Sequence, residues 1–148
     1  MSTHITIPAG ALVLVGDGRK ALFLRNKGTP LHANLVTERV LEQDNPPTRE
    51  QGSDRPGRTY GIDGVSRSAL EQTDWHQLAE DRFASEIADA LYRAGHAHGF
   101  EQLIVVAPPR ILGNLRAAFH QEVAKRIVAE VPKDLTSRPV TEIAALLS

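Results

Sequence analysis

Residues 103–116 read LIVVAPPRILGNLR, and this stretch decides the fold class. Its first five residues are apolar and rich in isoleucine and valine, and they are too few for a helix. They predict a strand that is covered on both faces. Pro108 and Pro109 end that strand, because a proline cannot donate a hydrogen bond to a sheet. Apolar residues then recur at helical spacing and predict a helix that follows at once: Ile111, Leu112, Leu115 and Phe119.

A buried strand that turns directly into a helix is typical of an α/β domain. Pro109 suits the first helical turn, where its missing N–H is not needed. Ligands of such sheets tend to bind at the carboxyl ends of the strands. We therefore treat Pro108, Pro109 and Arg110 as candidate binding residues. The alternative is that the two prolines only terminate the strand.

Length and composition indicate one ordinary globular domain over residues 1–148. The chain is 41% apolar and 24% charged, and its net charge of −1 gives no general attraction to nucleic acid or anionic lipid. Any contact with RNA would therefore need a local patch. The absence of cysteine excludes disulfides, thiolate nucleophiles and cysteine-bound metals. No signal pattern and no long apolar run occurs, so we expect a cytoplasmic protein without membrane insertion.

Two strands joined by a hairpin are predicted near the start of the chain, at residues 11–15 and 20–25. Asp17-Gly18 lies between them, and an Asp-Gly pair between apolar runs is a strong hairpin signal. The same letters imitate a dinucleotide-binding fingerprint, but that motif requires a helix of several turns directly after it. Residues 31–41 predict a third strand with a bulge or one covered face.

Residues 44–73 interrupt the regular pattern. Prolines and glycines break any periodicity, so we expect about thirty residues without a helix or strand, a length that usually marks function or disorder. Arginines are scattered through the segment, and a guanidinium group matches the oxygens of a phosphate. Arg67 is one candidate contact. A mobile surface loop is the alternative interpretation.

The SDRPGR sequence at residues 53–58 is the most specific part of this segment. Pro56 fixes one φ angle and the following glycine permits a sharp turn, so Arg55 and Arg58 are presented three residues apart. We expect Asp54, Arg55, Pro56 and Arg58 to belong to a binding loop. Alternatively, Asp54 pairs with Arg58 and braces the loop.

The second half of the chain alternates helices and strands. Asp74 and Gln77 fit a capping box, which predicts a helix start at residue 74. A strand at 127–131 and a terminal helix after Ser137 or Pro139 complete the order. The prediction is an α/β fold with a mixed five-stranded sheet flanked by helices.

Few residues carry an obvious chemical signature. Asp17 ends the first strand, where a metal-binding carboxylate would lie in a ribonuclease-H-type nuclease, but two-metal chemistry needs several converging carboxylates. Asp17 is therefore a weak catalytic candidate, and a hairpin residue is the simpler interpretation. The histidines show no metal-ligand spacing, and we expect no metal and no cofactor.

Several stretches together resemble the bacterial host-attachment protein family, described as required for attachment to host cells. Besides the Asp17-Gly18 hairpin, the matching runs are SDRPGR (53–58), FASEIADAL (83–91), LIVVAPP (103–109), LGNLR (112–116) and KDLT (133–136). The resemblance covers nearly the whole chain and adds Lys133 and Asp134 to the candidate binding residues.

That family is similar to the middle domain of archaeal and eukaryotic class-1 release factors, which implies a ribonuclease-H-like fold. In those factors a Gly-Gly-Gln loop ahead of a long helix helps to hydrolyse peptidyl-tRNA. Residues 44–73 lie at the corresponding place but contain no Gly-Gly-Gln. Peptidyl-tRNA hydrolysis is therefore not carried over.

Three functions remain open on the sequence. The first is a non-enzymatic binding module that contacts the ribosome or RNA through its arginine-bearing loop. The second is a protein-interaction domain that sees no nucleic acid. The third is a metal-dependent, ribonuclease-H-like hydrolase that uses Asp17. The sequence does not fix the oligomeric state.

Overall fold

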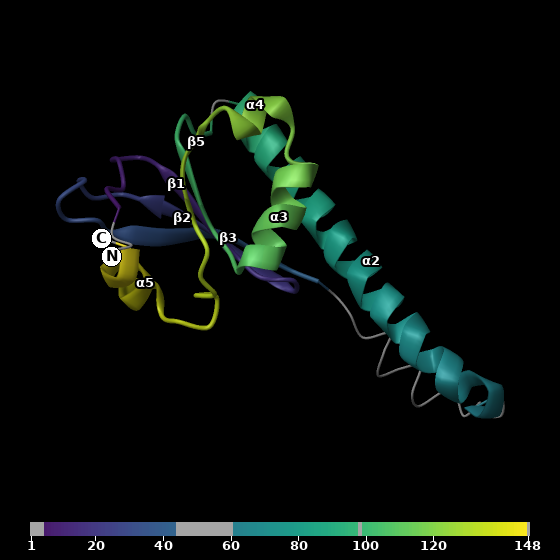
Figure 1. The fold of residues 1–148 in the computed structure, drawn as a ribbon. Coiled ribbons are helices and arrows are strands. Elements are labelled where there is room, and N and C mark those ends of the chain that lie inside the picture. Colours follow the sequence, from purple (N-terminus) through teal and green to yellow (C-terminus); the bar gives the residue numbers. More distant parts are fainter. Residues whose placement is uncertain (1–4, 44–60, 98, 148) are drawn as a thin grey trace.

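A five-stranded sheet with the strand order β3-β2-β1-β4-β5 forms the centre of the molecule (Figure 1). The computed structural model describes residues 5–43, 61–97 and 99–147, and the side chains of its longest helix from Gln77 onward. The strands are β1 (Leu12–Gly16), β2 (Lys20–Asn26), β3 (Leu35–Glu42), β4 (Leu103–Val106) and β5 (Ile127–Val131). All five strands were expected from the sequence, and their existence is confirmed.

The sheet is mixed, as the sequence predicts. β1, β2 and β3 pair in an antiparallel meander, while β4 is parallel to both β1 and β5. The antiparallel pairing of β1 with β2 confirms the hairpin at Asp17-Gly18. A register shift opposite Phe23 and Leu24 confirms the bulge in β3. As a result β1, β3, β4 and β5 all run in one direction and end at the same edge of the sheet.

Helices cover both faces of the sheet. They are α2 (Gly61–His96), α3 (Pro109–Ala118), α4 (Gln121–Ala124) and α5 (Val140–Leu147). α2 and α3 lie side by side on one face, and α5 lies on the other (Figure 1).

Alternate residues of each central strand enter two separate apolar clusters. Leu12 and Leu14 pack under α2 and α3, whereas Val13 and Val15 pack under α5. All four residues of β4 are 0% exposed. Because helices cover both faces of the sheet, the central strands are apolar at every position and do not alternate between apolar and polar residues.

The start of α2 corrects the sequence prediction. The helix begins at Gly61, so residues 61–73, expected to be irregular, are helical, and Asp74 and Gln77 do not form a helix start. A glycine inside a helix costs only about 1 kcal/mol, and no proline follows Pro56 until Pro108. Gly61 and Gly64 therefore do not prevent helix formation, although the sequence prediction took them as helix breakers. Residues 44–60, the rest of the expected irregular segment, lie outside the described residues.

The N-terminal half of α2 projects beyond the sheet and α3 (Figure 1). The helix has 36 residues, which corresponds to a rod of about 54 Å. Leu78 is 55% exposed, and Phe83 is the first buried side chain in the part of α2 whose side chains are described. Among the described side chains of α2, apolar packing therefore lies in the C-terminal half of the helix.

Asn26, at the end of β2, is a buried polar hub. Its Nδ2 donates to the carbonyl oxygens of Ile7 (2.9 Å) and Pro8 (3.2 Å). Its Oδ1 accepts from the backbone N–H groups of Gly28 (2.8 Å) and Asn34 (2.9 Å). One side chain thus ties the N-terminal segment and the β2–β3 connection to the sheet.

Removing this hub should destabilise the protein strongly. Asn26→Ala leaves backbone donors and acceptors without partners, and we expect the free energy of unfolding to fall by about 2–4 kcal/mol in urea titrations. Asn114→Ala is the matched control, because the Asn114 Nδ2 is buried and makes no hydrogen bond among the described residues. We expect that variant to lie within about 0.5 kcal/mol of wild type. Equal losses in the two variants would contradict the role of Asn26.

Arg25 and Glu38 form a forked ion pair between β2 and β3. The Arg25 Nε and Nη2 donate to the two carboxylate oxygens of Glu38 at 3.1 and 3.0 Å, and Nη1 donates to the carbonyl oxygen of Gly10 at 3.0 Å. The hydrogen bonds from Arg25 hold the pKa of the Glu38 carboxyl below its ordinary value of 4.5.

This pair predicts a pH dependence of stability. Because the folded-state pKa of Glu38 is the lower one, the pair stabilises the fold above about pH 4.5 and loses this contribution as the pH falls. We expect Glu38→Gln to show a shallower fall of the urea midpoint than wild type between about pH 5 and pH 3. The exposed Glu86 supplies the control, since Glu86→Gln should keep the wild-type slope. A wild-type slope in Glu38→Gln would refute the prediction.

Candidate functional site at the carboxyl edge of the sheet

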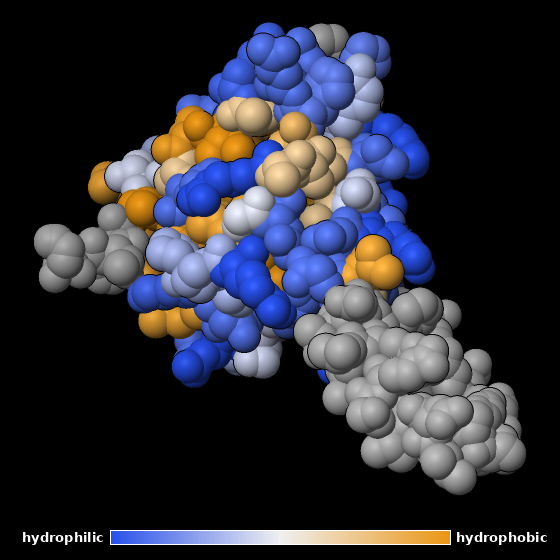
Figure 2. Space-filling model, turned by 45° about the vertical axis from the view of Figure 1, so that its right-hand side comes forward, coloured by the Kyte–Doolittle hydropathy of each residue, from blue (hydrophilic) through white to orange (hydrophobic). Residues whose placement is uncertain are grey.

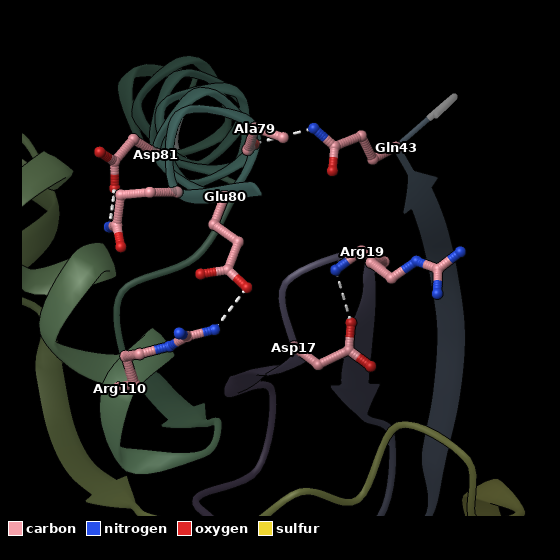
Figure 3. Close-up of polar contacts among 8 residues, drawn as sticks. Asp17, Arg19, Gln43, Ala79, Glu80, Asp81 and Arg110 are labelled. Carbon is pink, nitrogen blue, oxygen red and sulfur yellow. Dashed lines mark hydrogen bonds and ion pairs between the residues drawn. The ribbon is translucent and has the colours of Figure 1, made fainter. Parts of the chain in front are cut away.

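The carboxyl ends of the parallel strands bring polar side chains from distant parts of the sequence to one edge. Asp17 follows β1, Gln43 follows β3, Arg110 follows β4, and Asp134 follows β5. Glu80 of α2 lies over the same edge (Figure 3). The sheet topology therefore assembles this group of residues.

Asp17 holds the β1–β2 turn. Its Oδ1 accepts from the backbone N–H groups of Arg19 (2.7 Å) and Lys20 (2.8 Å), and the first of these bonds is drawn in Figure 3. Its Oδ2 accepts from the Thr136 hydroxyl at 2.8 Å. Both carboxylate oxygens of Asp17 are thus engaged within the protein, as expected for a turn residue.

Thr136 links the turn to the segment after β5. It is only 6% exposed, and its hydroxyl also lies 3.1 Å from the Oδ1 of Asp134. One hydroxyl hydrogen can be donated fully to only one of the two carboxylates at a time. Asp17 and Asp134, separated in sequence, are therefore held around a single threonine.

Glu80 carries the second contact of the edge. Its Oε2 accepts from the Nη2 of Arg110 at 2.6 Å, and the Glu80 side chain is 18% exposed whereas that of Arg110 is 67% exposed. The other oxygen, Oε1, is buried and has no hydrogen-bond partner among the described residues. A Cβ added to Gly18 would lie 3.0 Å from Oε2, so the glycine leaves room for this carboxylate.

Gln43 joins the end of β3 to α2. Its Nε2 donates to the backbone carbonyl of Ala79 at 2.8 Å, as Figure 3 shows. A carbonyl oxygen has two lone pairs, so Ala79 can accept this bond in addition to its helical one. Gln43 is also the last described residue before residues 44–60.

The structure brings only some of the predicted site residues together. Asp17, Arg110 and Asp134 lie at this edge, with Pro108 as the N-cap of α3 and Pro109 as its first residue. Lys133 lies two residues after the end of β5, and its backbone N–H donates to the carbonyl of Val131. The other predicted residues are not placed: Asp54, Arg55, Pro56 and Arg58 lie outside the described residues, and Arg67 falls in α2 where only the backbone is described.

Three contributors to the edge were missed by the sequence analysis: Gln43, Glu80 and Thr136. Glu80 looks like one of many charged residues on the solvent side of a helix, and no local pattern marks it. Thr136 belongs to the KDLT run, which the resemblance highlighted without giving it a role. Gln43 could not be recognised, because its partner Ala79 is distant in the sequence.

The edge contains carboxylates that are engaged within the protein and guanidinium groups that are exposed. Within residues 5–43, 61–97 and 99–147, no three histidine, aspartate or glutamate side chains form a group able to hold a metal ion. Both oxygens of the Asp17 carboxylate and the Oε2 of Glu80 already accept hydrogen bonds from protein donors. The exposed guanidinium of Arg110 and the exposed side chain of Arg19 are the groups that a ligand could reach.

The structure is a five-stranded α/β domain with a long α2, which fits a release-factor-like family. The model of Bacterial archaeo-eukaryotic release factor family 12 matches residues 10–147, and the chain belongs to this family. A comparison with curated proteins gives no match. The family match supports the release-factor side of the resemblance seen in the sequence, while host attachment is no part of the family's description. In the described part of the chain, no helix has the length and apolar character needed to cross a bilayer.

The hydrogen bonds of Asp17 make its role testable. Asp17→Ala removes three accepted hydrogen bonds, and we expect it to lower the free energy of unfolding by about 2 kcal/mol. Asp17→Asn should lose less than half as much, because its amide oxygen can still accept from the turn. Urea titration measures both, with Asp89→Ala at a 72% exposed side chain of α2 as the control. Equal losses in Asp17→Asn and Asp17→Ala would show that negative charge, and not acceptor geometry, is what the turn requires.

Proposed function

We propose that this protein is a non-enzymatic binding module that contacts the ribosome or its RNA through the arginine-bearing residues 44–73. The observation that carries this proposal is the projecting half of α2, which follows residues 44–60 directly and extends away from the sheet (Figure 1). Arg67 lies within that projecting half.

Membership in a release-factor-like family supports a partner in translation. A long helix that leaves the domain body can reach into a partner that the sheet itself does not touch. Arginines at its start would meet phosphates in a forked geometry, which suits RNA. The chain lacks Gly-Gly-Gln, so the proposal includes binding and excludes peptidyl-tRNA hydrolysis.

The surface near the projecting helix also favours RNA over an apolar protein partner. In Figure 2 this surface is mainly polar, and the larger apolar area lies on the opposite side of the view. The exposed large apolar residues of the described part are scattered over a loop, two strands and one helix: Leu31, Val36, Val40, Leu78 and Val128. Val36 lies opposite Arg25 of β2, and Val40 lies opposite Leu22. Arg25 and Leu22 are three residues apart in β2, so their side chains point to opposite faces of the sheet, and the same holds for the two valines.

Three finer assignments belong to the same proposal. We assign the domain to the ribonuclease-H-like folds, which the strand order and the mixed sheet support. We place the protein in the cytoplasm, where ribosomes are. Attachment to host cells, which the sequence resemblance implied, is in this view a downstream effect of action on translation.

The test is co-sedimentation of the purified protein with ribosomes at low and moderate salt. We expect salt-sensitive binding that falls at least about tenfold in the variant Arg55→Ala/Arg58→Ala/Arg67→Ala. Each lost phosphate contact should lower the slope of log affinity against log salt by about 0.7–0.9. The matched control, Arg82→Ala/Arg93→Ala/Arg138→Ala, removes the same charge at exposed positions of α2 and the α5 start and should bind nearly as wild type.

Two results would overturn the proposal. If wild type stays at the top of the gradient at both salts, the ribosome is not its partner, and a protein-interaction domain takes precedence. If the two triple variants lose affinity equally, net charge and not residues 44–73 causes binding. RNA cleavage that requires Mg²⁺ and disappears in Asp17→Asn would instead establish the hydrolase.

A further inference from the structure

Among the described side chains, polar contacts from other elements meet α2 just before its apolar packing begins. Apolar packing of the described part of α2 begins at Phe83, and Leu78 is 55% exposed. Between them, Ala79 and Glu80 meet side chains from other elements. We infer that Gln43, Glu80 and Arg110 are positioning residues that fix the direction of the projecting half of α2. This inference rests on the proposed function and names what makes that half effective in binding.

The contacts reach one turn of the helix from three sides. Gln43 donates to the Ala79 carbonyl at 2.8 Å, and Arg110 donates to the Glu80 carboxylate at 2.6 Å. Gly18 lies against the same carboxylate, because a Cβ there would be 3.0 Å from its Oε2. We call the contacts of Gln43 with Ala79, and of Arg110 and Gly18 with Glu80, the basal clamp, of which Figure 3 shows those of Gln43 and Arg110.

Stability alone does not explain the clamp. The Glu80 Oε1 is buried without a hydrogen-bond partner among the described residues, which is a cost. Arg110 is 67% exposed, so solvent weakens the attraction that offsets this cost. Partly buried ion pairs of this kind contribute little net stability, and in some proteins they serve to hold two elements in one arrangement.

The position of the basal clamp along α2 determines how far the start of the helix moves when the helix tilts. Gly61 lies eighteen residues before Ala79, which corresponds to a lever of about 27 Å at 1.5 Å per residue. A tilt of about 10° at the clamp would move the start of the helix by about 5 Å, more than a hydrogen-bonded contact tolerates. The clamp therefore sets where the arginine-bearing residues meet a partner.

The experiment measures distances between two spin labels by pulsed electron paramagnetic resonance. The chain has no cysteine, so Ser68→Cys in α2 and Thr141→Cys in α5 would carry the only labels. Gln43→Ala/Glu80→Gln opens the clamp, and Gly18→Ala disturbs it independently by crowding Glu80. Glu86→Gln is the matched control in the same helix, at an exposed position. Thermal unfolding confirms that every variant is folded.

We expect one narrow distance distribution in wild type and in Glu86→Gln. In the two clamp variants it should shift or broaden by about 5 Å, as the lever predicts. Unchanged distributions in both clamp variants would overturn the inference.

Ribosome co-sedimentation of the same variants separates the inference from the proposed function. Altered distances together with at least about tenfold weaker binding support both. Altered distances with wild-type binding would refute a positioning role in binding. If the clamp variants change the distances but wild type does not bind ribosomes, the proposed function is refuted. The clamp would then still fix the direction of α2 as a property of the fold.

Discussion

The burial of both faces of β1 and β4 is the constraint on which the rest of the structure depends. Their side chains divide between two apolar clusters, one under α2 and α3 and one under α5. Helices must cover both faces of such strands, and β4 accordingly lies parallel to both β1 and β5, while β1 keeps an antiparallel hairpin with β2 on its other side. Parallel strands in turn end at a common edge. The apolar runs that form the core therefore also determine where the polar residues gather.

At that edge, contacts within the protein take up most of the polar groups. Asp17 braces a turn and shares Thr136 with Asp134, while Glu80 is held by Arg110. The side chains of Asp17, Thr136 and Glu80 thus brace the protein's own elements at this edge. Glu80 belongs to α2, in which Phe83 is the first buried side chain among those described.

The division of α2 into a packed half and a projecting half has an energetic basis. Helical segments gain most of their stability from packing an apolar face, and propensity alone is marginal in water. The packed half buries Phe83, Ile87 and Leu91 at no more than 1% exposure. The projecting half continues a helix that is already nucleated, so each further residue costs less than starting a new helix would.

The sequence by itself determined the strands, their order along the chain, the Asp17-Gly18 hairpin and the likeness to release factors. These follow from short-range signals: apolar runs, an Asp-Gly turn, a double proline and local motifs that fall within single elements. It misjudged the start of α2, because glycines look like strong breaks although each costs little inside a long helix. Only the tertiary structure decided that Thr136 joins Asp17 and that Gln43 and Arg110 meet α2. Those contacts arise from strand order in space, and no period or spacing along the chain encodes which strand ends will lie together.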